Sequence, residues 1–361
     1  IKKSIPFANK PEDIVPGIAD YYATTYVQDG DVVSVLAKVR DGRPIKLEGN
    51  DLSPLTGGGT SARVQAAVLD LYDTARLRFP TIGGKEATFE AIDKAIAAEL
   101  SGNTVIVTSS ITSPTTKKVV AQFLAKHPGS KHVTYDAVSN SAMLLANEAC
   151  YGKRALPSYQ FDKAKTIVSL GADFLGTWLS PVEFSKQYSQ NRKVTGEKPE
   201  LSRHIQFESI MSMTGSNADD RYIHKASETG AVAVAILNQL NGTAPSFKEA
   251  ALNEGIKKTV ESLKSAGGNA LVVSGSNDVN VQIVVNAINE AIGANGKTIN
   301  WAVTSNYRKA IDADMNALVA DMNSGAVGAV LIQGVNPAYS YSDSKKFVEG
   351  LKKVVGVSFN G

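Results

Sequence analysis

Two turns in this sequence carry residue types that suit contact with a polar ligand. Gly171 and Asp173 follow one apolar run of strand length, and Gly334 and Asn336 follow another in the same order. Glycine lets a ligand or a second backbone approach closely, and a short Asp or Asn side chain can pair with the edge of a base. Open α/β sheets bind ligands at the carboxyl ends of their strands. An ordinary strand-to-helix turn remains the alternative, because such turns also favour Gly and Asn.

The single cysteine, Cys150, excludes an internal disulfide and supplies too few thiolates for an iron–sulfur cluster. It closes an expected helix over Ser141–Cys150 on an apolar stripe. We therefore expect it to be a small buried hydrophobe rather than a reactive thiol.

Other residues that could do chemistry are few. The run Gly83-Gly84-Lys85-Glu86 departs from the P-loop pattern, and no nucleophile elbow occurs. The histidines lack the spacing of metal ligands, and we expect them at the surface or in packing: His127, His132, His204 and His224. We predict no catalytic residue and no metal ligand.

The composition is that of a folded, nearly neutral protein. The chain has 361 residues, a formal net charge of +3 and 43% hydrophobic residues, which is enough for more than one core. No run of about 18 apolar residues occurs, so we predict no membrane span. Basic residues form no stripe interleaved with aromatics, and we therefore predict no nucleic-acid partner.

The chain is predicted to form two kinds of sheet, and the two turns fall in the part with parallel strands. Short β-branched runs within residues 21–50, with the hairpin signal Asp41-Gly42, predict a small antiparallel sheet, and a helix is expected over Ser61–Tyr72. From residue 86 onward, buried strands alternate with helices, which predicts parallel sheets covered by helices. The expected strands include 104–108, 132–135, 166–170, 204–211, 270–273, 298–303, 328–332 and 356–359; the expected helices include 89–100, 113–126, 141–150, 229–240, 246–265, 280–292, 310–323 and 342–354.

The N-terminal stretch resembles the N-terminal domain of the molybdopterin oxidoreductase superfamily. The likeness rests on the Asp41-Gly42 hairpin, on Gly57–Gly59 followed by Ser61 and Arg63, and on Leu71–Pro80. In that family four cysteines of this domain hold an iron–sulfur cluster. Here Ser61 stands where the fourth cysteine falls, and Arg63 replaces a lysine. A hydroxyl is a poor substitute for a thiolate on iron, so we expect no cluster in this region.

The two candidate turns resemble cofactor loops of the same family. Thr166–Trp178 is similar to the loop that meets one pterin guanine dinucleotide, and Gly334–Pro337 is similar to the Gly-x-Asn-Pro turn that meets the other. The resemblance implies an α/β protein in which the small N-terminal sheet domain precedes two pseudo-symmetric, doubly wound parallel-sheet domains. The implied domains are residues 1–82, residues 83–160 together with 296–361, and residues 161–295.

Further departures from the family concern the cofactor itself. The stretch Met213–Leu237 follows the segment leading into the family's Pro-Gly-Thr-Asp helix, but Ser227-Glu228 replaces Pro-Gly, and Gly230 replaces the acid. No residue matches the family's molybdenum or tungsten ligand. We expect no cofactor in this region, with these candidate residues forming a vestigial crevice: Gly171, Asp173, Gly334, Asn336, Ser61 and Arg63.

The opening stretch is similar to one branch of that family. Ile5–Gly17 and Tyr21–Tyr26 resemble the large iron–sulfur subunit of bacterial alternative complex III, whose molybdopterin-oxidoreductase-like region lacks the metal cofactor. The resemblance implies a non-catalytic scaffold in a quinol-oxidising electron-transfer complex on the periplasmic side of the inner membrane. It implies cytochrome c subunits and an integral quinol-binding subunit as partners. We also expect the chain to be part of a longer protein, with iron–sulfur clusters in a region beyond residue 361.

Two alternatives remain. One is an active molybdopterin-dependent oxidoreductase, and the other is a stand-alone periplasmic ligand-binding protein with two α/β lobes.

Overall fold

The structure is a computed structural model that describes residues 12, 14–28, 31–100, 103–196 and 200–359. Most of the opening stretch Ile5–Gly17, which carries the alternative complex III resemblance, lies outside these residues. The chain divides into two compact units, Ile1–Arg78 and Phe79–Gly361. Each is described by itself, and the expected division into three domains stays a prediction.

The first unit contains the expected antiparallel sheet, in the order β1-β2-β3. Its strands are β1 (Ala19–Gln28), β2 (Asp31–Arg40) and β3 (Arg43–Gly49). The predicted hairpin is confirmed, because Asp41 and Gly42 join β2 to β3 with φ angles of 51° and 75°. Two positive φ angles define the turn whose twist matches the flanking strands.

The expected helix after this sheet forms in two parts. The α-helix α1 (Ala62–Ala66) is followed by the 3₁₀ helix η2 (Ala67–Tyr72). Ser61 begins α1, and its hydroxyl accepts a hydrogen bond from the Val64 amide at 3.3 Å. The Tyr72 hydroxyl donates to the carbonyl of Pro44 at 2.6 Å, so η2 is tied back to β3.

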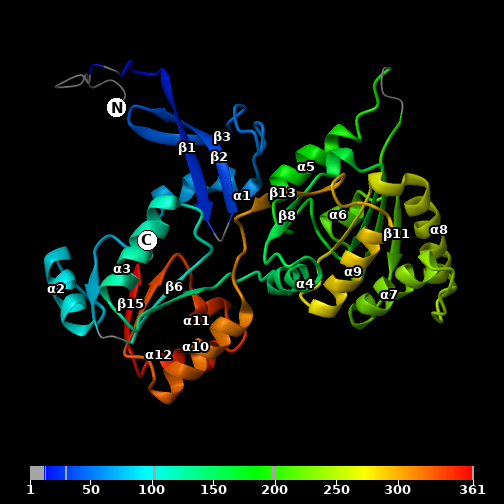
Figure 1. The fold of residues 1–361 in the computed structure, drawn as a ribbon. Coiled ribbons are helices and arrows are strands. Elements are labelled where there is room, and N and C mark those ends of the chain that lie inside the picture. Colours follow the sequence, from blue (N-terminus) through cyan, green and yellow to red (C-terminus); the bar gives the residue numbers. More distant parts are fainter. Residues whose placement is uncertain (1–11, 13, 29–30, 101–102, 197–199, 360–361) are drawn as a thin grey trace. The chain divides into compact units, whose positions relative to one another are not determined.

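The second unit contains two parallel sheets, which confirms the predicted α/β class. One sheet has the order β15-β14-β6-β7 and joins strands from distant parts of the chain, as β6 and β15 show (Figure 1). Its strands are β6 (Thr104–Thr108), β7 (Lys131–Thr134), β14 (Ala329–Gln333) and β15 (Val355–Phe359). The helices of this part are α2 (Phe89–Glu99), α3 (Pro114–Lys126), α10 (Asp312–Ser324), α11 (Pro337–Ser340) and α12 (Ser344–Leu351), and the short strands β4 (Thr81–Ile82) and β5 (Lys85–Glu86) precede them.

The other parallel sheet has the order β11-β10-β9-β12. Its strands are β9 (Thr166–Leu170), β10 (Arg203–Glu208), β11 (Asp220–Ile223) and β12 (Ala270–Ser274). The helices are α4 (Ser141–Tyr151), α5 (Pro181–Gln190), α6 (Met213–Ser216), α7 (Thr229–Leu240), α8 (Ala250–Ala266) and α9 (Val279–Ala291). An antiparallel pair, β8 (Leu156–Tyr159) and β13 (Ile299–Ser305), adjoins them in sequence.

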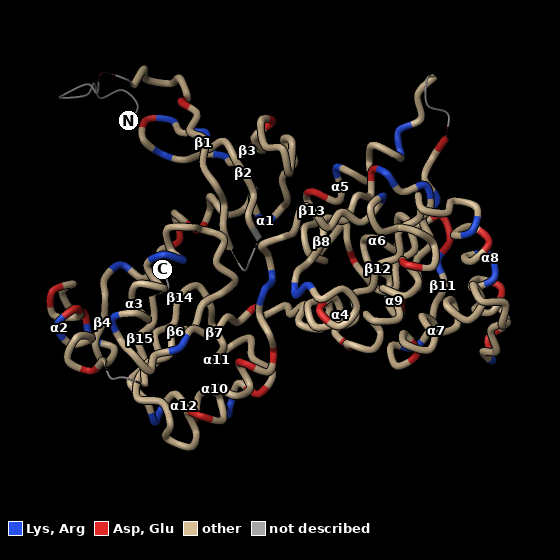
Figure 2. The backbone as a smooth tube through the Cα atoms, in the orientation of Figure 1, with Lys and Arg blue, Asp and Glu red and all other residues tan. Residues whose placement is uncertain are grey.

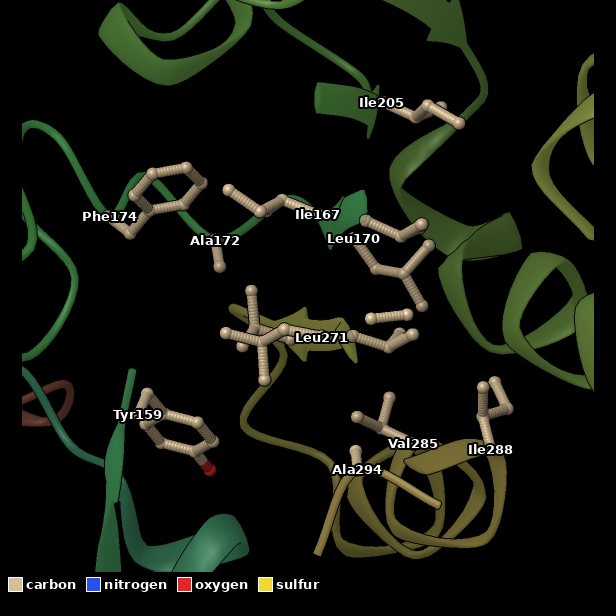
Figure 3. Packing of buried hydrophobic residues seen from close by; sticks show 14 of the residues in the cluster. Tyr159, Ile167, Leu170, Ala172, Phe174, Ile205, Leu271, Val285, Ile288 and Ala294 are labelled. Carbon is tan, nitrogen blue, oxygen red and sulfur yellow. The ribbon is translucent and has the colours of Figure 1, made fainter. Parts of the chain in front are cut away.

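The larger core lies around the second parallel sheet. Every residue of β9 and β12 is buried, as expected for parallel strands covered on both faces. Figure 3 shows Ile167 and Leu170 of β9 above Leu271 of β12, with Val285 and Ile288 of α9 on the other side. A smaller core of the first parallel sheet includes Val107, Val330, Met322 and Phe347.

One strand is shorter than its sequence predicts. The apolar residues Ile210 and Met211 extend the pattern of β10, but both are largely exposed, and the strand ends at Glu208. The Glu208 carboxylate accepts hydrogen bonds from the hydroxyl and amide of Ser212, which turn the chain away from the sheet. A local polar contact therefore overrides the apolar pattern here.

Candidate functional site at the ends of β9 and β14

Both candidate turns lie at the carboxyl end of an inner strand. β9 runs between β10 and β12, and β14 runs between β15 and β6. In one sheet the chain leaves β6 toward β7 and leaves β14 toward β15, on the opposite side. In the other sheet it leaves β9 toward β10 and β11 and then returns past β9 to form β12 on the opposite side. Such switch points are where open parallel sheets bind ligands. Gly171 and Gly334 begin the two loops with φ angles of 68° and 65°, a conformation that favours glycine.

The β9 loop, residues 171–180, is closed by backbone packing. A Cβ added to Gly275, which follows β12, would lie 2.3 Å from the carbonyl oxygen of Gly171. The Gly275 amide also donates to the Leu170 carbonyl at 3.0 Å. The space between the ends of β9 and β12 is therefore filled by main chain.

The half-buried Asp173 side chain is bonded to other parts of the second unit. Its Oδ1 accepts hydrogen bonds from the amide and the hydroxyl of Thr214, at 3.0 and 2.8 Å. Its Oδ2 accepts from the Thr177 hydroxyl at 3.3 Å. Thr214 is fully buried, and its hydroxyl oxygen also accepts from the Leu175 amide. The carboxylate thus joins the β9 loop to α6.

The rest of the β9 loop is fastened in the same way. The buried Ser169 hydroxyl donates to the Ala172 carbonyl and accepts from the Ala172 amide, at 2.9 and 3.0 Å. The Asp173 carbonyl accepts amide hydrogen bonds from residues 176, 177 and 178. A Cβ at Gly176 would lie 2.2 Å from Asp173 Oδ2, so a larger residue there would displace the carboxylate. Three of the roughly four acceptor positions of the Asp173 carboxylate are thus in use within the protein.

The β14 loop, residues 334–336, is more open. A Cβ at Gly334 would lie 3.6 Å from the Ser109 hydroxyl oxygen, which is an ordinary contact distance. The Asn336 carbonyl accepts from the amides of Tyr339 and Ser340, whereas the exposed Asn336 side chain makes no capping hydrogen bond to α11. The two candidate turns therefore have the same backbone start and different side-chain environments.

A buried carboxylate that the sequence analysis did not single out lies in the sheet that contains β14. Asp136 follows β7 and accepts from the amide and hydroxyl of Ser110 at 2.9 and 2.7 Å, and from the Ala310 amide at 3.1 Å. It is 4% exposed. These bonds join the ends of β6 and β7 to the segment before α10. The signal for it was present as an acidic residue two positions after the end of β7, comparable to Asp173 three positions after the end of β9.

Two lysines, Lys117 and Lys309, lie near the carboxyl end of β6. The Lys309 amide donates to the Ser110 hydroxyl oxygen, and the Lys309 ammonium donates to Asn306. Partial burial, together with the positive charge of Lys117, lowers the pKa of Lys309. Arg308, just before it, is buried with a φ of 52°, a strained conformation for a long side chain.

Ser61 and Arg63 lie in the first unit, whereas the other candidates lie in the second. The Ser61 hydroxyl is used as a helix cap, and Arg63 is exposed. Within the second unit, the structure brings Asp173 together with Thr214 and places Gly334 beside Ser109.

A buried polar row runs along β10, the neighbour of β9. The side chains of His204, Gln206 and Glu208 are linked in that order, at 3.3 and 3.0 Å. Burial lowers the pKa of His204 to about 4, so the imidazole is neutral at pH 7. Burial opposes ionisation of Glu208, but hydrogen bonds led by the one from Arg221, at 2.6 Å, outweigh it and lower the pKa of Glu208.

Cys150 is exposed, so its predicted burial is wrong. The first turns of α4 are buried on all sides, whereas its last turn reaches the surface, and the position along the helix decides the exposure of the thiol. Within the described part of the chain, no group of three or more His, Cys, Asp or Glu side chains could hold a metal ion. The described helices include none long and apolar enough to cross a membrane.

The chain is similar in sequence to a curated subunit of a menaquinone reductase. It is 21% identical, over 382 aligned positions, to a protein of Nitratidesulfovibrio vulgaris named "Menaquinone reductase, molybdopterin-binding-like subunit". The match covers 89% of this chain and 53% of the relative, so the chain spans about half the length of that protein. This similarity supports the predicted relationship to the molybdopterin oxidoreductases. The link to alternative complex III stays a prediction.

No family model matches the chain. Among solved structures, the chain is similar to one in the formyltransferase/hydrolase complex (FhcABCD) from Methylorubrum extorquens, determined in complex with methylofuran. The TM-score is 0.49 at 13% identity, with 77% of this chain and 80% of the other covered.

Proposed function

We propose that this chain is a non-catalytic scaffold region of a respiratory oxidoreductase complex, built on a molybdopterin-oxidoreductase-like fold. Its similarity to a molybdopterin-binding-like subunit of menaquinone reductase supports the respiratory assignment. The missing cysteines and the Ser61 replacement support the loss of iron–sulfur chemistry in this region.

The observation that carries the proposal is the internal bonding of Asp173. A guanine dinucleotide in the β9 loop needs a polar side chain free to pair with the base. Asp173 instead accepts three hydrogen bonds from Thr214 and Thr177. Asp173 therefore has most of its acceptor positions in use within the protein, so the β9 loop fits this cofactor poorly and is better suited to the role of a structural joint.

The partners and location follow from the same proposal. We place the chain on the periplasmic side of the bacterial inner membrane, in contact with cytochrome c subunits and an integral quinol-binding subunit. Iron–sulfur clusters would reside in another region of the protein and carry the electrons. The resemblance of Tyr21–Tyr26 and its flanking stretch to alternative complex III supports this arrangement.

Cofactor content of the purified complex tests the proposal. Molybdenum and tungsten are measured by mass spectrometry, and guanine nucleotide is measured after acid release. An active molybdopterin enzyme, purified and treated identically, serves as the positive control. We expect both metals and the nucleotide to be far below one equivalent of chain, and stoichiometric metal with guanine nucleotide would overturn the scaffold assignment.

An active molybdopterin enzyme is the second candidate, and the open β14 loop favours it. The side chain of Asn336 is exposed, and so is that of Lys309, whose amide is bonded to Ser110 just beyond β6, the strand next to β14. A protein that bound one dinucleotide at β14 alone would release guanine nucleotide in the same assay. The assay therefore separates both candidates.

A further inference from the structure

We propose that a groove at the amino edge of the second parallel sheet binds a phosphate group of a small molecule or a lipid. The groove has a volume of about 620 Å³ and lies between α8 and the starts of β9 and β10. It is on the opposite edge of the sheet from the β9 loop. The inference does not depend on the proposed function.

Three cationic side chains line this groove: Lys165, Arg203 and Lys258. Among the described residues, no carboxylate lies within ion-pair distance of Lys165, and Lys258 has only the exposed Glu254 at 3.8 Å. Exposed pairs of this kind contribute little, so both ammonium groups are available to a ligand. Figure 2 shows positive and negative residues interspersed along α8, which means that the groove is not part of a surface of one charge.

Arg203 supplies a fixed group between the two lysines. Its guanidinium donates to Asp220 Oδ2 at 2.7 and 3.0 Å and to the Ser262 hydroxyl at 3.2 Å. The pairing with Asp220 orients the planar fork, and guanidinium groups suit phosphate geometry. The Ser265 hydroxyl, also in the lining, adds a neutral donor. Asp220 balances the charge of the guanidinium, so Arg203 contributes oriented N–H groups while the two ammonium groups contribute the positive charge that a phosphate would meet.

One of the residues that line the groove is acidic and would weaken the binding of an anion. Glu261 lines the groove with the three cations, and its charge repels a phosphate. Removing this acid and removing the lysines must therefore have opposite effects on phosphate affinity. A structural role of the same residues would not produce that reversal.

Calorimetric titration of the purified protein with inorganic pyrophosphate tests the site. In low salt, the double variant Lys165→Gln/Lys258→Gln is expected to bind about tenfold more weakly, from about threefold for each lost charge. Glu261→Gln is expected to bind about threefold more tightly. The control Lys352→Gln, outside the groove, is expected to bind like the wild type, and thermal melting confirms that each variant folds.

Vesicles distinguish the source of the phosphate. The proteins are co-sedimented with vesicles of phosphatidylcholine, with or without phosphatidylglycerol. Pyrophosphate binding with the expected variant order supports a soluble ligand, and the same order seen only with phosphatidylglycerol supports a lipid headgroup. Binding that is equal in all variants, or binding to neither probe, would overturn the proposal.

Discussion

The β9 loop and the β14 loop start alike and end differently. Both follow an inner parallel strand, and both begin with a glycine at positive φ. In the β9 loop the acidic side chain turns inward to Thr214, whereas in the β14 loop the Asn336 side chain stays exposed. An apolar strand followed by Gly and then by Asp or Asn therefore specifies the backbone of the turn. It does not specify whether the polar side chain bonds within the protein or stays exposed.

The largest expected effect comes from removing the polar group of the closed loop. Asp173→Ala leaves the buried Thr214 amide and hydroxyl without their acceptor, which should lower the free energy of unfolding by about 3 kcal/mol. The matched variant Asn336→Ala should change it by less than about 0.5 kcal/mol, because that side chain is exposed. Urea unfolding measures both, and equal losses would remove the contrast between the loops.

Acid should weaken the sheet of the closed loop through His204. Its folded-state pKa of about 4 lies below the ordinary value of 6.5, so the unfolded chain binds the proton more tightly. Stability is therefore highest above pH 6.5 and is lost as the pH falls toward 4, by up to about 3 kcal/mol. Unfolding at several pH values checks this against His204→Gln, which should have a flatter profile between pH 6.5 and 4; an identical profile in the variant would contradict it.

A methyl group added at Gly275 should destabilise the protein more than one added at Gly334. Gly275→Ala forces the ends of β9 and β12 apart, since the Cβ meets the Gly171 carbonyl at 2.3 Å, and should cost about 2 to 3 kcal/mol. Gly334→Ala meets no close atom and should cost about 1 kcal/mol from its positive φ alone. Thermal denaturation of both variants gives the order, and a larger loss at Gly334 would reverse the account.

The smallest effect on stability is expected at Lys309, near the end of β6. Lys309→Gln removes a charge that lies near Lys117, and the stability should change by less than about 0.5 kcal/mol. A chemical denaturation curve with an unchanged midpoint is the expected outcome. A loss of several kcal/mol would mean that Lys309 is part of a closed structure like that of Asp173.

The sequence predicted the elements better than the use of side chains. The Asp41-Gly42 hairpin and the largely apolar inner strands β9, β12 and β14 were clear because turn chemistry and burial act locally. The antiparallel strand β8 was missed because it has only four residues. The helix α5 was also missed, although Phe184 and Tyr188, four residues apart, form its buried face. The end of β10 was misplaced because a contact between Glu208 and Ser212 decides it.

The candidate residues show the same limit. Gly171 and Gly334 have the conformations that the pattern requires. The partner of Asp173, Thr214, is 41 residues away in sequence, and no local pattern could show that the carboxylate is already bonded. The same applies to Asp136, whose bonds to Ala310 close over 174 residues.

Amide hydrogen exchange at Thr214 tests the central claim most directly. If Asp173 fastens the β9 loop to α6, this amide should exchange slowly in the wild type and much faster in Asp173→Ala, with other amides of the sheet unchanged. Rapid exchange of the Thr214 amide in the wild type, at the rate of an open loop, would contradict the claim that the β9 loop is a structural joint.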